Sequence, residues 1–191
     1  MIDSLKNDID LIKAIGKGSE RELKVLYDSY SEKVYNTALS YVKNIEEAEE
    51  ITQDVFVSIY KSASGFKGNS KVSTWIYRIA VNTSLNYVSK KKRLNAFRDN
   101  VETPQSVDFN HPGVVLENKE KAEALYKATD CLPDSQKTAF ILSYIEGLPR
   151  QEVADVMETS LKAVESLLQR AKKNMRTELT KMYPNRRKFN K

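Results

Sequence analysis

Hydrophobic residues recur at three- and four-residue intervals along three stretches of the first half of the chain, which is the spacing of one buried helix face. The stretches run from Leu23 to Val42, from Ala48 to Ile59 and from Val72 to Thr83. Glycines and serines in the segment 62–70 predict the end of one helix and the start of another. The sequence shows no sustained alternation of polar and apolar positions, so we predict an all-α fold. Trp75 lies at the helical spacing, and we interpret it as a core residue.

The hydrophobic period stops near Asn95. The following segment contains two prolines, several turn-forming residues and no helical pattern, which indicates a flexible linker. Helical spacing resumes at Val115. We therefore predict two helical bundles joined by a flexible linker, with a first domain at 1–94, the linker at 95–114 and a second domain at 115–191.

The second bundle contains the pattern of a helix-turn-helix between residues 149 and 176. A short helix from Gln151 to Met157 is followed by a turn at 158–160, and Ser160 is suited to cap the next helix. That longer helix has a buried stripe formed by Val164, Leu168, Ala171 and Met175. Two helices joined by such a turn are typical of a unit whose second helix enters the major groove of DNA. The alternative is an ordinary helical hairpin with a solvated outer face.

The outer face of the second helix carries the candidate DNA contacts. Ser166 and Gln169 are suited to hydrogen-bond base edges, and Glu165 is suited to accept from a cytosine amino group. The lysines and arginines are suited to hold phosphates. The full predicted set is Lys162, Glu165, Ser166, Gln169, Arg170, Lys172, Lys173 and Arg176.

Composition supports a polyanionic partner and excludes several chemistries. The 191 residues include 31 lysines and arginines against 26 acids, a net charge of +5, and a high pI favours nucleic acid as a partner. One cysteine and one histidine exclude an internal disulfide framework, a structural zinc site and a histidine-based triad. No segment approaches the roughly 18 apolar residues of a membrane span, and the N-terminus lacks the pattern of a secretory signal. We predict a soluble, cytoplasmic protein.

Charge is also distributed unevenly in the first bundle. The cluster 90–93 is wholly basic, whereas the segment 46–50 and Asp54 are acidic. Glu46, Glu50 and Asp54 follow each other at four-residue spacing, so they share one helix edge. Three interpretations are open at this point: a solvated face, a carboxylate site of a metal-dependent nuclease, or a surface that docks onto a basic protein. Nothing else in the chain supplies an obvious nucleophile or base for a nuclease.

Taken together, the two halves resemble a known family. Residues 26–93, with EEAEEITQDVF and STWIYRIAVN, look like the promoter-melting domain of bacterial sigma factors, and residues 131–179, with RAKKNMR, resemble their C-terminal domain. The chain is most similar to the small, two-domain extracytoplasmic-function (ECF) group. The resemblance implies a non-enzymatic specificity subunit that binds core RNA polymerase, directs it to specific promoters and initiates transcription without a cofactor or a metal.

The resemblance also implies residue roles in the first domain. The helix spanning roughly 46–61 would dock on the clamp helices of the largest polymerase subunit, with Glu46, Glu47, Glu50 and Asp54 as the docking residues. The loop 62–70 and the following helix would capture a base flipped from the non-template strand at the minus-ten element. The implied minus-ten set is Phe66, Lys67, Asn69, Ser73, Arg78, Asn82, Lys90, Lys91, Lys92 and Arg93.

The same resemblance assigns the helix-turn-helix to duplex DNA at the minus-thirty-five element and the linker to the RNA exit region. Sigma factors of this group are commonly held by an anti-sigma factor, often membrane-bound. The recognition helix departs from the family pattern, because Ala163, Glu165 and Leu167 stand where Thr, Lys and Arg are frequent. We interpret Glu165 as a base reader or as a brake on non-specific binding. The runner-up hypothesis is a stand-alone helix-turn-helix transcriptional regulator.

Overall fold

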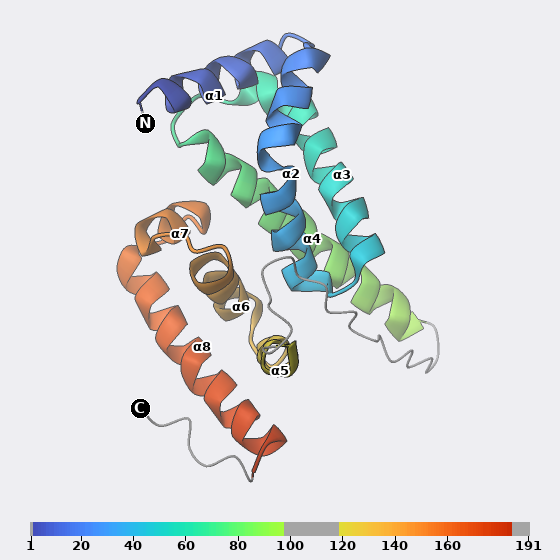
Figure 1. Ribbon diagram of the computed structural model, residues 1–191, viewed down its shortest axis with the longest axis vertical. Helices are drawn as coiled ribbons and strands as arrows, with labels where there is room; N and C mark the ends of the chain where they lie inside the picture. The colour runs from blue at the N-terminus through green and yellow to red at the C-terminus, as the bar shows by residue number, and fades with distance from the viewer. Residues whose placement is uncertain (1, 98–118, 185–191) are drawn as a thin grey trace. The chain divides into compact units, whose positions relative to one another are not determined.

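The computed structural model of the protein describes residues 2–97 and 119–184. The chain divides into two compact units, Met1–Ser106 and Val107–Lys191 (Figure 1). The described residues form helices and turns and contain no strand, which confirms an all-α fold with two helical domains. Most of the predicted linker, from residue 98 onward, lies outside the described residues, and the domain limits at 94 and 115 stay predictions.

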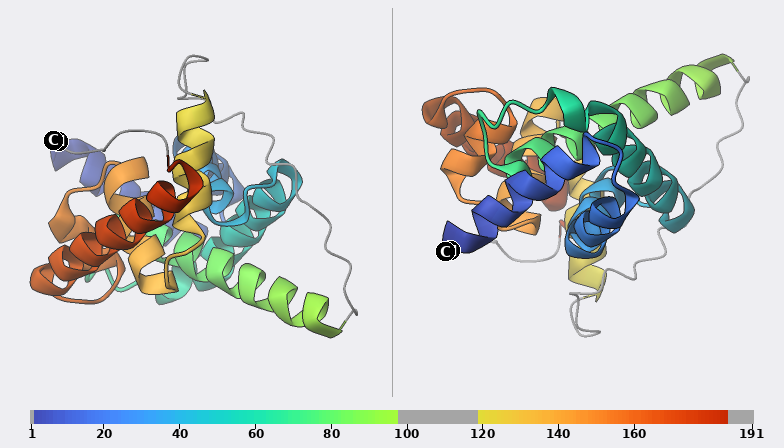
Figure 2. Two further views of the ribbon diagram at one scale, coloured as in Figure 1. Left: turned by 90° about the horizontal axis from the view of Figure 1, so that it is seen from below. Right: turned by 90° about the horizontal axis from the view of Figure 1, so that it is seen from above.

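The N-terminal unit is a bundle built around three long helices. Helix α1 spans Ile2–Ile15, α2 Glu20–Val42, α3 Ile45–Ser62 and α4 Val72–Phe97, and the 3-10 turn η1 spans Ala63–Gly65. Helices α2, α3 and α4 pack against one another, and α1 lies across one end of the bundle, where it contacts α2 and η1 (Figures 1 and 2).

The predicted apolar stripes form most of the centre of this bundle, although Tyr27, which the predicted stripe of α2 included, is 43% exposed. All five residues of the α3 stripe are buried, namely Ala48, Ile51, Val55, Phe56 and Ile59. The predicted core position of Trp75 is only partly correct, because this residue is partly buried. The hydrophobic residues that α4 buries most completely are Val72, Ile76 and Ala80 instead. Helix α4 also continues to Phe97, three residues beyond the predicted limit of the first domain.

Helix α3 begins sharply after α2. Lys43 adopts the left-handed conformation (φ 57°) and its N–H donates to the carbonyl of Leu39, which ends α2. The side chain of Asn44 then accepts a hydrogen bond from the backbone N–H of Glu47 at 2.8 Å and caps α3. This two-residue connection places the acidic first turn of α3 beside the end of α2.

Helix α1 was not predicted from the sequence. It contributes Ile12 and Ile15, both almost fully buried, and the hydroxyl of Tyr30 in α2 donates to Asp8 at 2.6 Å. Gly16 follows α1 and lies so close to η1 that a Cβ there would approach the Cα of Ser64 to 2.9 Å. The end of α1 therefore packs directly on the turn that leads into the loop before α4.

The C-terminal unit is arranged around α8. Helix α5 spans Lys119–Thr129, α6 spans Asp134–Phe140 and continues into the π-helical turn η3 (Ile141–Ile145), α7 spans Arg150–Val156, and α8 spans Leu161–Met182. Helix α8 packs against α5, α6 and α7. One hydrophobic cluster of this unit consists of Ala128, Leu132, Phe140, Ala171 and Met175, with Ile145 and Leu179 packed against it. No helix in the described part of the chain is long and apolar enough to span a membrane.

Candidate functional site

Helices α7 and α8 form the predicted helix-turn-helix. In the turn between them Glu158 has a positive φ of 51°, and the N–H of Thr159 donates to the carbonyl of Ala154 at 3.0 Å. The hydroxyl oxygen of Ser160 accepts from the N–H of Ala163 at 3.2 Å, which confirms Ser160 as the cap of α8. Ala154 is fully buried. Val156 is buried as well, whereas Met157 is only partly buried.

Helix α8 has one buried face and one polar face. Its buried residues are Val164, Leu168, Ala171 and Met175, the four predicted from the spacing. All eight candidate duplex contacts are exposed, namely Lys162, Glu165, Ser166, Gln169, Arg170, Lys172, Lys173 and Arg176. The structure therefore brings them onto the solvent side of one helix, and their role in DNA binding stays a prediction.

Glu165 has an internal partner that the sequence did not reveal. A nitrogen of the Arg150 guanidinium, in the first turn of α7, lies 3.6 Å from a Glu165 carboxylate oxygen. The ammonium of Lys172 lies 4.9 Å from the centre of the Tyr144 ring. These four residues, with Leu168 and Gln169, line a groove of about 260 Å³. Arg150 and Tyr144 thus join the candidate surface through contacts between elements, which helical spacing within α8 cannot predict.

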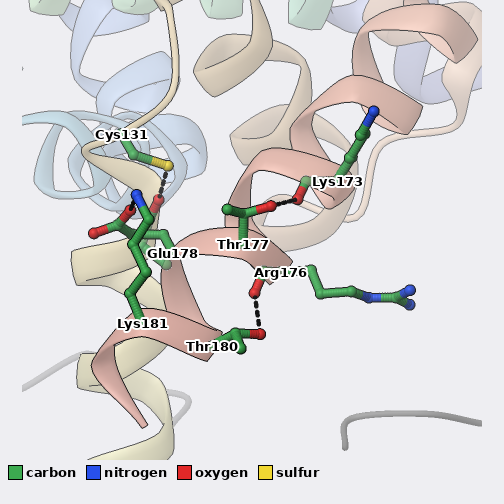
Figure 3. Close-up of polar contacts among 8 residues, drawn as sticks. Cys131, Lys173, Arg176, Thr177, Glu178, Thr180 and Lys181 are labelled. Carbon is green, nitrogen blue, oxygen red and sulfur yellow. Dashed lines mark hydrogen bonds and ion pairs between the residues drawn. The ribbon is translucent and has the colours of Figure 1, made fainter. Parts of the chain in front are cut away.

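Two further pairs shape the polar face of α8. The guanidinium of Arg170 donates to the hydroxyl of Ser166 at 3.2 Å and to its carbonyl at 3.3 Å. Lys173 and Arg176 extend away from the helix, whereas Lys181 pairs with Glu178 at 3.2 Å (Figure 3). Lys172, Lys173 and Arg176 are exposed, and their contact with phosphates stays a prediction. The basic tail 186–191 lies outside the described residues.

Two aromatic rings lie against each other, tilted by 40°, where the loop between α3 and α4 meets the first turn of α4. The centroids of Phe66 and Trp75 are 4.9 Å apart, and both side chains are partly buried. Of the other predicted minus-ten residues in this region, Lys67, Asn69 and Asn82 are exposed, and Ser73 and Arg78 are partly buried. The loop thus combines an aromatic surface with neighbouring polar and basic groups, which is the combination that binds unpaired bases.

The four residues of the basic end of α4 (residues 90–93) differ in exposure and in ion pairing. Lys90, Lys92 and Arg93 are exposed, whereas the ammonium of Lys91 forms an ion pair with the carboxylate of Glu47 in α3. The last turns of α4, which carry this segment, project beyond the packed part of the bundle (Figure 2).

We use the term acidic edge for Glu46, Glu47, Glu50 and Asp54 of α3. Glu46, Glu50 and Asp54 are exposed, while the side chain of Glu47 is 18% exposed. The hydroxyl of Tyr87 in α4 donates to Glu50 at 3.2 Å. Partial burial, together with the negative charges of the acidic edge, raises the pKa of Tyr87 to about 12. The acidic edge is therefore in direct contact with α4.

A second acidic surface lies between α2 and α3. A groove of about 400 Å³ is lined by Tyr27, Ser31, Glu32, Tyr35, Glu49, Thr52 and Gln53, with no lysine or arginine among them. Burial and the charge of Glu49 raise the pKa of Tyr35. Within the described ranges, no three histidine, cysteine or acidic side chains are grouped so as to hold a metal ion. Glu46, Glu50 and Asp54 are therefore not grouped as a metal site in the described structure, and their contact with a basic protein surface stays a prediction.

Comparison with known proteins gives matches to both units. Residues 26–94 match Sigma-70 region 2, and residues 122–175 match Sigma-70, region 4. The chain is 27% identical to the RNA polymerase sigma-H factor of Pseudomonas aeruginosa, covering 87% of this chain and 91% of that protein. It is also 27% identical to the ECF RNA polymerase sigma factor SigW of Bacillus subtilis, covering 88% of this chain and 94% of the relative.

A solved structure shows the same fold. The sigma factor RpoE of Bartonella quintana, in complex with the anti-sigma factor NepR, aligns with a TM-score of 0.66 and 19% sequence identity, covering 87% of this chain and 99% of the other.

Proposed function

The chain belongs to the extracytoplasmic-function group of sigma-70 factors and is an RNA polymerase sigma factor. From this premise we propose a role for each of its two units and for the residues within them. The N-terminal unit binds core polymerase and opens the minus-ten element, and the C-terminal unit reads the minus-thirty-five element. The matches to both sigma regions, in order along one chain, favour this function over a stand-alone helix-turn-helix regulator. We propose that the protein acts through binding energy alone, with no bond chemistry of its own.

The observation that carries the proposal is the two-sided character of α8. Its four buried residues dock the helix on the domain, so that the eight candidate contacts face solvent together. A helix held in this way can enter the major groove, where side chains reach base edges. Because Arg150 pairs with Glu165, we propose that these two residues act as a unit in which the carboxylate orients the guanidinium toward DNA.

Replacement of Lys172 and Lys173 by alanine tests the phosphate role. Each phosphate contact releases counterions and contributes about 0.9 to the slope of log affinity against log salt. Binding of the holoenzyme to a promoter fragment is therefore expected to weaken and its salt slope to fall by about 1.8 for the double variant. The matched control is Lys127→Ala/Lys181→Ala, which removes the same charge from exposed positions on α5 and the end of α8. An unchanged slope in the Lys172/Lys173 variant would overturn the role.

Gln169→Ala should instead alter preference at particular upstream bases, and a uniform loss across sequences would argue against base reading.

We propose that the loop before α4 holds the flipped minus-ten base. Flipping a base costs a few kcal/mol, which stacking on an aromatic ring and hydrogen bonds to the base edge can offset. The adjacent, tilted Phe66 and Trp75 rings offer such a surface. Lys67, Asn69, Ser73, Arg78 and Asn82 would contact the base and its neighbours, and the basic end of α4 would hold the phosphates.

We propose the acidic edge as the docking site for core polymerase, on its clamp helices. The exposed carboxylates of Glu46, Glu50 and Asp54 support this role, because they present negative charge along one side of a rigid helix. The acidic groove between α2 and α3 extends the same negative surface around α3.

The partner in the Bartonella structure suggests a further interaction. That sigma factor is in complex with an anti-sigma factor, and we propose that this chain also binds an anti-sigma factor, which holds it inactive. The protein would then act in the cytoplasm, and a membrane-bound anti-sigma factor would keep the inactive form at the membrane surface.

A further inference from the structure

An ion pair connects the acidic edge to the basic end of α4 in the free protein. The Lys91 ammonium contacts a carboxylate oxygen of Glu47, although the two residues are 44 positions apart in the sequence. Their side chains are 32% and 18% exposed, respectively. This is therefore a partly buried contact between two helices rather than a pair formed on open surface.

A second contact reinforces the first. Tyr87 lies one helical turn before Lys91 in α4, and its hydroxyl donates to Glu50, which lies about one turn after Glu47 in α3. Two successive turns of α4 thus rest on the acidic edge. The other carboxylate oxygen of Glu47 is buried without a hydrogen-bond partner in the described part of the chain. Glu47 therefore depends on Lys91 for much of its charge compensation.

The ion pair occupies the Glu47 carboxylate and the Lys91 ammonium, which are proposed to bind polymerase and promoter DNA, respectively. Glu47 belongs to the surface proposed to receive polymerase, and Lys91 belongs to the segment proposed to hold promoter phosphates. An ammonium that is bound to a carboxylate must give up that contact, at least in part, before it pairs with a phosphate. Cations of a docked polymerase would compensate Glu47 in place of Lys91, so the two binding events are linked through one side-chain pair.

We infer that the Glu47–Lys91 pair is an internal clasp, which weakens DNA binding by the free protein and opens when core polymerase docks on the acidic edge. The inference rests on the proposed function, since it assumes that the acidic edge meets polymerase and that the basic end of α4 meets DNA. Because coupling between two ligands is reciprocal, DNA on Lys91 must strengthen polymerase binding by the same factor.

The DNA arm of the test uses the full chain without polymerase and a fluorescein-labelled single strand of about 20 nucleotides. Glu47→Gln removes the carboxylate charge and frees Lys91. We expect about threefold to tenfold tighter binding, the range for a partly exposed ion pair, and a salt slope steeper by about 0.7. The matched control is Asp28→Asn, which removes the same charge from an exposed position of α2. The double variant Glu47→Gln/Lys91→Ala should lose the gain.

The polymerase arm uses core enzyme without DNA and does not depend on the folding of Glu47→Gln. Lys91→Ala frees Glu47, so binding to core should tighten by a similar factor, whereas Lys24→Ala, on the exposed side of α2, should leave it unchanged. Equal DNA binding by Glu47→Gln and Asp28→Asn, or a gain that persists in the double variant, would overturn the clasp. So would unchanged core binding by Lys91→Ala.

Failure of the proposed function gives a different result. If Lys91 does not hold promoter phosphates, Lys91→Ala leaves promoter binding by the holoenzyme and its salt slope unchanged. If only the clasp is wrong, Lys91→Ala weakens promoter binding by the holoenzyme while Glu47→Gln leaves the free protein unaltered.

Discussion

The double charge reversal Glu50→Lys/Asp54→Lys is expected to abolish stable co-elution of the protein with core RNA polymerase. Both carboxylates are exposed on the acidic edge, one turn apart on α3. Reversal replaces attraction to a basic surface by repulsion, and like-charge contacts across an interface cost several kcal/mol, so we expect the affinity to fall on the order of a hundredfold. Gel filtration of the mixture, or a titration of labelled protein with core, measures the loss.

The control for this variant is Asp10→Lys/Asp28→Lys. It makes the same change in net charge at exposed positions of α1 and α2. Among the described residues it breaks an exposed pair of Asp10 with Lys13, whose contribution is small. Circular dichroism checks that both variants are folded. Co-elution by Glu50→Lys/Asp54→Lys at wild-type level would keep the family assignment and move the docking surface away from the acidic edge.

Leu168→Ala is expected to destabilise the C-terminal unit strongly. Leu168 is 3% exposed and lies in the buried stripe of α8. Truncation of a buried leucine to alanine removes apolar contacts and leaves a cavity, at a cost of about 2–5 kcal/mol. Because the stripe fixes α8 on its domain, loss of stability should also weaken binding to the minus-thirty-five element.

The single tryptophan makes this prediction specific to one unit. Trp75 is the only tryptophan of the chain and lies in the N-terminal unit, so its fluorescence follows unfolding of that unit alone. Far-ultraviolet circular dichroism follows both units. Leu168→Ala should lower the unfolding midpoint of the C-terminal component and leave the Trp75 transition in place. The adjacent Leu167→Ala, at a partly buried position, should cost much less. Equal losses for the two variants would contradict the assigned packing.

Local periodicity predicted the helix faces well. The stripes of α3 and α8 were predicted residue by residue, because a residue's position around one helix decides whether it meets the core. The cap at Ser160 could also be predicted from local sequence, because its hydroxyl oxygen and the Ala163 N–H that donates to it lie only three residues apart. The short N-terminal helix α1 was not predicted, although Ile9, Ile12 and Ile15 recur at three-residue spacing.

Contacts between helices could not be predicted from the sequence. Lys91 and Glu47 are 44 residues apart, and Arg150 and Glu165 meet across a turn. Which charges meet depends on the crossing of two helices, and a single sequence carries no pattern for it. The partial burial of Trp75 has the same origin, because it depends on where the loop carrying Phe66 packs.

The most direct test of the account is a map of RNA 5′ ends made by reconstituted polymerase on bacterial genomic DNA fragments. Core enzyme alone is compared with core enzyme plus this protein, under conditions in which the protein is folded and bound to core. If the proposed function is correct, some start sites appear only with the protein and share two short sequence elements, one read by each unit. Start sites no different from those of core alone, or sites that share a single element, would contradict it.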